Sequence, residues 1–201
     1  MKIGIFGGAF NPIHNGHMSL AENYFSLLHL DKLIFIPTAC PPHKTSQYLA
    51  PERDRFNMIS LAIENKSGFE ISLIEFDRQG KSYTYDTLKE LKKIYPDDEL
   101  FLIIGADQLL SFHLWYRYKE ILEMVTLCTG AREDESQRAQ MISYAENLDG
   151  LDMSRFRLLE ADVIRVSSTE LRNRIKNNES ISNLVPQGVE KYILETGLYN
   201  V

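Results

Sequence analysis

Short apolar runs alternate along this chain with longer segments of helical periodicity, and this alternation limits the possible folds more than any other feature. The apolar runs cover Leu33–Ile36, Leu100–Ile104, Val125–Cys128 and the strand-like Phe156–Glu160. The helical patterns cover His17–Leu30, Arg53–Glu64, Thr84–Ile94 and Trp115–Met124. Apolar strands separated by helices predict parallel βαβ units. We therefore expect an α/β, Rossmann-like, doubly wound and mostly parallel sheet with helices on both faces and a small C-terminal helical part.

Length and composition indicate how many domains this sheet and its helices form. The chain has 201 residues, of which 44% are apolar, enough for one substantial core. No repeat or Pro/Gly/Ser-rich linker divides it. We expect a single domain over residues 1–201, with a C-terminal helical subregion at about 163–201. The acidic segment 132–152 is predicted to be peripheral, with a helix near 136–147.

The charge and the cysteines exclude several classes of function. The net charge of −6 argues against nucleic acid as a partner, because binding to a polyanion needs dense Lys and Arg. No apolar run approaches the ~20 residues of a membrane span, and no secretion signal opens the chain. Cys40 and Cys128 are far apart and belong to no metal-type cluster. We expect a cytoplasmic protein with no membrane contact and no protein-bound metal.

A glycine turn followed by two histidines lies directly after the first strand-like run. The segment 7–17 has the sequence GGAFNPIHNGH and leads into a helical pattern. Backbone N–H groups in such a loop and at a helix N-terminus attract anions, and the imidazoles of His14 and His17 can donate to phosphate oxygens. The spacing fits neither a P-loop nor a dinucleotide fingerprint. A lone histidine here would be a cap or a core residue, but two at this spacing favour a triphosphate site.

A second polar motif begins a helix near the C-terminal end. Ser167 and Glu170 have the spacing of a capping box, which by itself explains the serines of the segment 166–172, VSSTELR. A capping box does not explain Thr169 and Arg172. These add a hydroxyl and a cation near a helix N-terminus that already favours anions.

Two further loops follow predicted strands, where ligands bind in open α/β sheets. Gly105-Ala106-Asp107 ends the most apolar strand, and Asp107 can contact a ligand there, cap the next helix, or do both. Pro41-Pro42-His43-Lys44 lies in the stiff loop after Ile36. A surface lysine in such a loop is most often simply solvated.

The first motif, Gly-Gly-x-Phe-Asn-Pro-x-His-x-Gly-His, resembles the signature of the nucleotidyltransferase α/β phosphodiesterase superfamily, and the segment 166–172 resembles its Ile-Ser-Ser-Thr-x-Ile-Arg motif. This resemblance implies catalytic roles at the phosphates for His14, His17, Lys44 and Arg172. The ATP-binding residues that it implies are Gly7, Gly8, Ala9, Phe10, His14, His17, Gly105, Asp107, Ser167, Ser168, Thr169 and Arg172. Ala9 departs from the usual Thr or Ser, so we expect retained activity with an altered contact to the acceptor phosphate.

Two other segments bear on the acceptor. Ser-Tyr-Thr-x-x-Thr-Leu at 82–88 and Trp-Tyr-x-Tyr at 115–118 look like segments of bacterial nicotinate mononucleotide adenylyltransferases. With Arg-x-x-Met at 55–58 and the closing Gly-Leu-Tyr at 197–199, this resemblance covers almost the full chain. The implied substrate-binding residues are Lys44, Thr84, Tyr85, Trp115 and Tyr116. The flat, cationic pyridinium can stack on Trp115, although a lone tryptophan on an amphipathic helix is more often a core residue. Thr84 and Thr87 are also candidates for helix caps.

The implied activity is transfer of AMP from ATP to nicotinate mononucleotide, which gives deamido-NAD and pyrophosphate. Mg²⁺ is expected to bind mainly through ATP, since it needs few protein ligands. One alternative is a sister enzyme that uses nicotinamide mononucleotide or another phosphate acceptor. A more remote alternative is a nucleotide-binding regulatory module without catalysis. Apolar residues in 192–201 leave a homodimer open.

Overall fold

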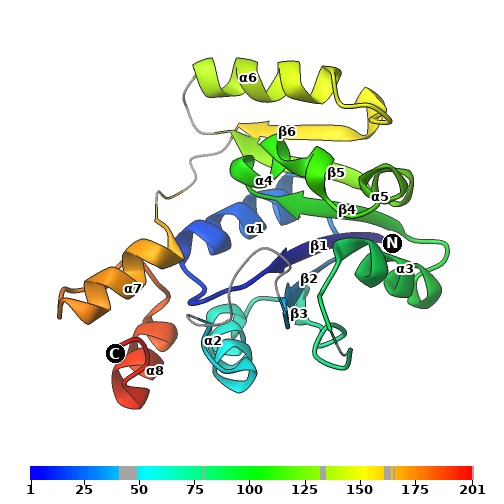
Figure 1. The fold of residues 1–201 in the computed structure, drawn as a ribbon. Helices are drawn as coiled ribbons and strands as arrows, with labels where there is room; N and C mark the ends of the chain where they lie inside the picture. The colour runs from blue at the N-terminus through cyan, green and yellow to red at the C-terminus, as the bar shows by residue number, and fades with distance from the viewer. Residues whose placement is uncertain (41–48, 79, 132–134, 161–163, 165, 201) are drawn as a thin grey trace.

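A parallel sheet of six strands forms the centre of the protein in a computed structural model that describes residues 1–40, 49–78, 80–131, 135–160, 164 and 166–200. The strands are β1 Lys2–Gly8, β2 Lys32–Pro37, β3 Phe69–Ile71, β4 Glu99–Ile104, β5 Thr126–Ala131 and β6 Phe156–Glu160. Their order is β3-β2-β1-β4-β5-β6, and every neighbouring pair is parallel. The predicted Rossmann-like, doubly wound fold is confirmed (Figure 1).

Helices cover both faces of this sheet because the strands are apolar on both sides. On one face lie α1 Asn15–Leu27 and α2 Glu52–Ile63, and the core on that side continues into α7 Ser168–Lys176 and α8 Gln187–Thr196. The other packs against α3 Thr84–Ile94, α4 Ala106–Leu110, α5 Tyr118–Met124 and α6 Glu135–Glu146. Side chains alternate along β1, so that Ile3 and Ile5 enter one core and Phe6 the other.

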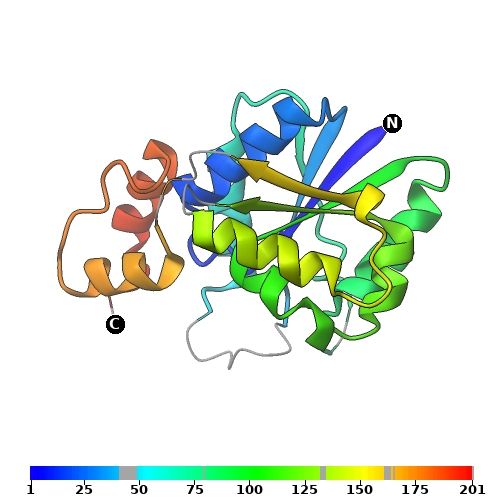
Figure 2. The same cartoon turned by 90° about the horizontal axis from the view of Figure 1, so that it is seen from above.

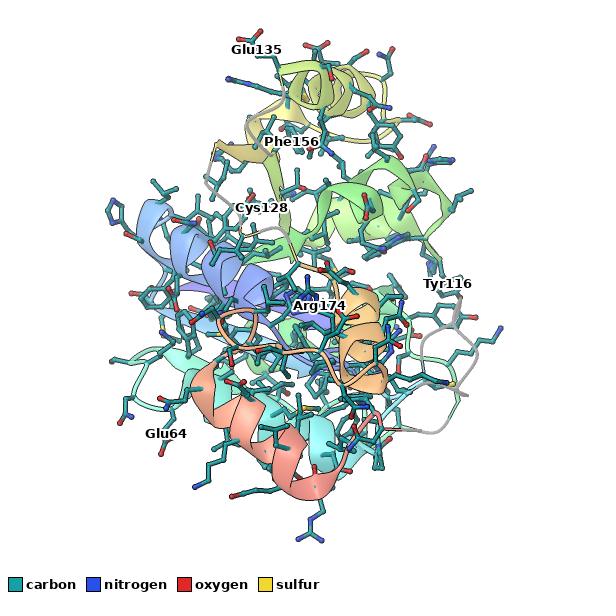
Figure 3. All side chains as sticks on the ribbon, turned by 90° about the vertical axis from the view of Figure 1, so that its left-hand side faces the viewer. Glu64, Tyr116, Cys128, Glu135, Phe156 and Arg174 are labelled. Atoms are coloured by element: carbon teal, nitrogen blue, oxygen red, sulfur yellow. The ribbon has the colours of Figure 1, made fainter. Side chains whose placement is uncertain are left out.

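The helices α7 and α8 lie together at one end of the sheet. Figure 2 shows them beyond the tips of the strand arrows, and Figure 3, viewed from that end, shows α8 lying along α2. Tyr192 of α8 bonds to Asn57 and Asp54 of α2 at 2.9 and 2.7 Å. The C-terminal helices therefore pack beside the edge at which the strands end. Within the described residues, no helix is long and apolar enough to cross a membrane.

Two expectations about secondary structure were wrong or incomplete. The predicted helix 115–124 begins only at Tyr118, after a 3₁₀ turn at Phe112–Leu114. Trp115 is extended, with φ −73° and ψ 142°, and Arg117 is left-handed, with φ 55°, so neither continues a helix. The short strand β3 had no recognisable pattern in the sequence. The helix expected near 136–147 is confirmed as α6, but it buries Met141 and Ala145 in the core rather than being only peripheral.

Candidate active site

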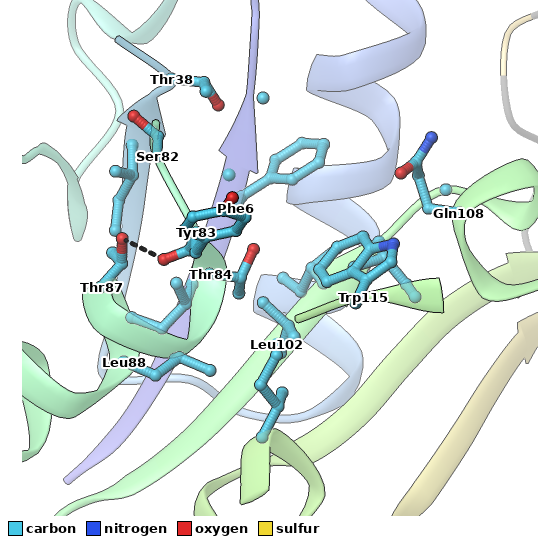
Figure 4. A pocket seen from close by; sticks show the side chains of 18 of the residues that line it. Phe6, Thr38, Ser82, Tyr83, Thr84, Thr87, Leu88, Leu102, Gln108 and Trp115 are labelled. Atoms are coloured by element: carbon cyan, nitrogen blue, oxygen red, sulfur yellow. Dashed lines mark hydrogen bonds between the residues drawn. The ribbon is translucent and has the colours of Figure 1, made fainter. Parts of the chain in front are cut away.

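A cavity of about 560 Å³ opens at the carboxyl ends of β1, β2 and β4, where the strand order reverses. Its walls come from the glycine turn, the first residues after β2 and β4, the start of α3 and the segment before α5 (Figure 4). The predicted site residues that line it are Gly7, Gly8, Ala9, His17, Gly105, Thr84, Trp115 and Tyr116. Segments more than 100 residues apart in sequence thus meet around one space.

The two histidines form a reciprocal cap at the start of α1. The His17 N–H donates to His14 Nδ1, and the His14 N–H donates to His17 Nδ1, both at 3.3 Å. Their rings are stacked with centroids 3.6 Å apart. Because each Nδ1 accepts a hydrogen bond, each ring carries its proton on Nε2. The cap fixes both the tautomer and the orientation of the two imidazoles.

The environments of the two histidines differ. His17 lines the cavity, whereas His14 is only 6% exposed. Burial lowers the pKa of His14 from 6.5 to about 4, so His14 is neutral near pH 7. A neutral ring with an Nε2–H donor can bind a phosphate oxygen without an added charge. His17 is the histidine that the fold presents to a ligand.

The backbone carbonyls of the loop before His14 are held by three distant side chains. Arg55 Nη1 donates to Ala9 O at 3.1 Å, and Arg172 Nη1 donates to Asn11 O at 2.8 Å. Ser168 Oγ donates to Pro12 O at 2.9 Å. The N-terminal and C-terminal motifs that the sequence singled out are therefore in direct contact, and two C-terminal motif residues bind the loop itself.

Arg55 is a site residue to which sequence reasoning assigned no role. It is fully buried, and Nε and Nη1 also donate to Ala50 O at 3.0 Å and Thr38 O at 2.7 Å. One guanidinium thus joins the glycine turn to the loop after β2. A signal was present, because Arg55 shares its helix face with Met58, Ile59 and Ala62, which are all buried.

The second motif begins a helix as predicted. Ser167 caps α7, with its Oγ accepting from the Glu170 N–H at 3.1 Å. This bond confirms the hydroxyl half of the expected capping box. The Glu170 carboxylate pairs with Arg174 at 3.2 Å instead of returning to the cap. Thr169 Oγ1 accepts from Arg172 Nη2 at 3.2 Å. This bond orients the guanidinium that also holds the loop.

Several predicted residues lie outside the cavity wall. Phe10 is 1% exposed and packs its ring on Phe6 and Phe35, so only its backbone is available to a ligand. Asp107 is exposed in the first turn of α4, and the N-cap there is Gly105, so the expectation that Asp107 caps this helix was wrong. Lys44 lies outside the described residues.

The other wall of the cavity is built around the N-terminus of α3. Its N-cap is Tyr83, so the expectation that Thr84 or Thr87 caps the helix was wrong. The N–H groups of Asp86 and Thr87 bond back to Tyr83 O. The N–H groups of Thr84 and Tyr85 precede them and have no acceptor within the helix. This end of α3 attracts anions.

Aromatic side chains stand beside this helix terminus. The Tyr116 ring lies 4.8 Å from the Tyr83 ring and 6.0 Å from that of Tyr85. Trp115 packs on Phe112 with ring centroids 4.9 Å apart and lines the cavity. Trp115 therefore has one side supported by the core while it still borders the cavity. It is not a tryptophan on a regular helix face.

A buried polar cluster below this wall was missed from the sequence. Thr87 Oγ1 lies 2.8 Å from Glu75 Oε1 and 3.3 Å from Tyr83 O, a contact drawn in Figure 4, and it also accepts from Arg78. Burial raises the pKa of the Glu75 carboxyl. Glu75 lies in a loop without periodicity, so no sequence pattern marks it as buried. Within the described part of the chain, no three His, Cys, Asp or Glu side chains gather as a metal site.

Comparisons with known proteins agree with this geometry. The family model described as cytidylyltransferase-like matches residues 5–174. A "Probable nicotinate-nucleotide adenylyltransferase" of Lachnoclostridium phytofermentans is 39% identical over 198 residues, covering 98% of each chain. One of the same name from Dehalococcoides mccartyi is 40% identical and covers 100% of this chain and 98% of its own.

A solved structure shares the fold at lower identity. The Plasmodium falciparum nicotinic acid mononucleotide adenylyltransferase complexed with NaAD matches with a TM-score of 0.78 at 20% identity, covering 99% of this chain and 97% of its own. The family match and the sequence identity along nearly the whole chain indicate the same family, and the shared fold is consistent with it. The chain belongs to the cytidylyltransferase-like family and, within it, to the nicotinate-nucleotide adenylyltransferases.

Proposed function

We propose that this enzyme transfers AMP from ATP to nicotinate mononucleotide, releasing pyrophosphate and forming deamido-NAD. The observation that carries the proposal is a cavity that joins the His17 loop to the N-terminus of α3 and the Trp115 ring. One end of the cavity suits phosphates, and the other suits a flat ring that carries a carboxylate. The full-length similarity to nicotinate-nucleotide adenylyltransferases supports the same substrates.

The reaction needs no protein nucleophile. A phosphate oxygen of the mononucleotide attacks the α-phosphorus of ATP, and the bond from that phosphorus to the β-phosphate oxygen breaks on the opposite side. The protein contributes position and charge stabilisation. His17 donates its Nε2–H to a phosphate oxygen. His14, whose backbone N–H holds the His17 ring, is also predicted to act at the phosphates. Arg172 adds positive charge beside the loop, and Lys44 is predicted to reach the reacting phosphates.

We assign the remaining predicted residues either to the triphosphate or to the adenosine of ATP. Gly7, Gly8 and the backbone of Ala9 and Phe10 would border the phosphates, with Ser167, Ser168 and Thr169 at the start of α7 on the far side. Gly105 and Asp107 are assigned to the adenosine. Gly105 supports this through its place on the cavity wall.

The nicotinate group would bind between α3 and the aromatic side chains. The N–H groups of Thr84 and Tyr85 suit a carboxylate because they begin a helix. The Tyr116 backbone N–H is predicted to join them, and the Trp115 ring offers a face to the cationic pyridinium. A carboxylate gains more from such N–H groups than an amide does, which favours nicotinate over nicotinamide.

Mg²⁺ would enter with the nucleotide. The described acidic residues form no all-protein site, and Mg²⁺ commonly keeps several waters and binds substrate phosphates. When bound, it neutralises phosphate charge. The residues of this chain would act on the same phosphates through hydrogen bonds.

The organisation of the whole protein is part of the proposal. Residues 1–201 work as a single domain, because Ser168 and Arg172 of the C-terminal helical subregion bond to the loop at 11–12. A cytoplasmic location and a homodimer remain predictions. Leu194, 68% exposed on α8, supplies an apolar contact for the dimer. Cell fractionation and sedimentation test the two.

A pyrophosphate-release assay with ATP and a panel of acceptors tests the function. We expect the highest kcat/KM with nicotinate mononucleotide, a lower one with nicotinamide mononucleotide and none with phosphopantetheine. A preference for the amide would replace the substrate assignment with that of a sister enzyme. No release with any acceptor would identify a nucleotide-binding module without catalysis.

A further inference from the structure

The C-terminal end of the chain returns to the loop that carries the histidines. Gly197 and Tyr199 have φ values of 68° and 71°, and these turn the chain back after α8. The Tyr199 hydroxyl then donates to Asn11 Oδ1 at 2.8 Å, across 188 residues of sequence. The expected site contained no residue beyond Arg172.

Asn11 is the point at which several distant segments meet. It is 5% exposed, and its Oδ1 also accepts from the Ala50 N–H at 2.9 Å. Its backbone oxygen accepts from Arg172. The Asn11 side-chain oxygen thus accepts hydrogen bonds from Tyr199 and from the segment before α2. The Asn11 backbone oxygen is bound by Arg172 of α7. The side-chain amide of Asn11 cannot rotate without breaking the hydrogen bonds to Tyr199 and to Ala50.

Resting on the proposed function, we propose that Tyr199 is a positioning residue for the His14–His17 pair, acting through Asn11 of the same loop. Asn11 lies three residues before His14, and Pro12 between them limits the backbone. A shift of Asn11 is therefore passed to the start of α1, where the two rings are stacked. Transfer between bound phosphates is sensitive to such shifts, since a displacement of about 1 Å can cost on the order of 100-fold in rate.

A second tyrosine of the C-terminal region provides a matched control. Tyr192 also makes hydrogen bonds through its hydroxyl, to Asp54 and Asn57, but these link α8 to α2 and do not reach the loop. Tyr199→Phe and Tyr192→Phe each remove one hydroxyl from the same part of the fold. If the two tyrosines only stabilise the protein, the two variants should have the same kcat and KM values.

The experiment measures kcat and both KM values for wild type, Tyr199→Phe and Tyr192→Phe by pyrophosphate release at 25 °C, with Tm recorded for each. We expect Tyr199→Phe to lower kcat about tenfold, while Tyr192→Phe keeps kcat within about twofold of wild type. In a His17→Ala background, Tyr199→Phe should cost less than about twofold, because the group that it positions is gone.

An equal loss in both backgrounds, or equal kcat values for the two tyrosine variants, would overturn the proposal. A second measurement does not depend on turnover: the imidazole C2–H NMR signals of His14 and His17 should shift in Tyr199→Phe and stay in place in Tyr192→Phe. A wild-type protein without pyrophosphate release refutes the proposed function alone. In that case, unshifted histidine signals in Tyr199→Phe refute the positioning role separately.

Discussion

The burial of His14 makes the stability of this enzyme depend on pH in a predictable window. His14 has a pKa of about 4 in the folded protein, against 6.5 when it is solvated. Between these values the unfolded chain binds a proton that the folded chain does not. Stability is therefore complete above pH 6.5 and falls as the pH drops toward 4. Each pH unit in this window changes the free energy of unfolding by about 1.4 kcal/mol.

The change from pH 7.5 to pH 5 should thus cost about 2 kcal/mol through this one residue. Carboxylates also titrate near pH 4, so a variant is needed to separate the contribution of His14 from theirs. His14→Asn is suitable because asparagine is a good N-cap, and its side-chain oxygen can accept from the His17 N–H in place of Nδ1. It keeps the cap and removes the titrating group.

Urea denaturation followed by circular dichroism at pH 7.5 and pH 5 measures the effect. Wild type should lose about 2 kcal/mol more than His14→Asn over this interval. Equal losses in the two proteins would show that His14 is not desolvated in the way its burial indicates. A C2–H NMR titration of wild type provides a direct check, since one of the five histidines should titrate near pH 4.

Four further changes test the site. His17→Ala should lower kcat by about 100-fold or more in the pyrophosphate assay, because it removes a donor at the reacting phosphates; a near-normal rate would remove His17 from the mechanism. Arg55→Met should lower the free energy of unfolding by about 3 kcal/mol in urea, as one buried and two part-buried carbonyls lose their donor, while exposed Arg53→Met should change it by less than about 0.5 kcal/mol. Trp115→Ala should raise KM for nicotinate mononucleotide about tenfold and leave KM for ATP unchanged, with Trp115→Phe intermediate; equal effects on both substrates would place the ring elsewhere. Ala9→Thr adds a hydroxyl beside the phosphates and should lower KM for the acceptor; if KM and kcat both stay unchanged, that hydroxyl has no role in this enzyme.

Much of the fold follows from local patterns. The runs that became β2 and β4 are apolar because both faces of these strands are buried, and the predicted boundaries of α3 match the structure. The glycine turn, the histidines and the start of α7 were also recognisable, since caps and phosphate loops depend on residues close in sequence. Where local signals were weak or misleading, as at β3 and Trp115, contacts from elsewhere decided the conformation.

By itself, the sequence determined the sheet class, the glycine turn with its two histidines and the order of the helices around it, because each depends on periodicity or on residues within one turn of each other. The tertiary structure alone decided which groups hold that loop and shape the acceptor wall. Arg55 contacts Ala9 across 46 residues, Arg172 contacts Asn11 across 161, and Tyr199 contacts Asn11 across 188. Glu75, in the loop after β3, meets Thr87 near the start of α3 only because the fold brings these two segments together. Such pairings depend on where the strands end in space, and sequence spacing does not encode that.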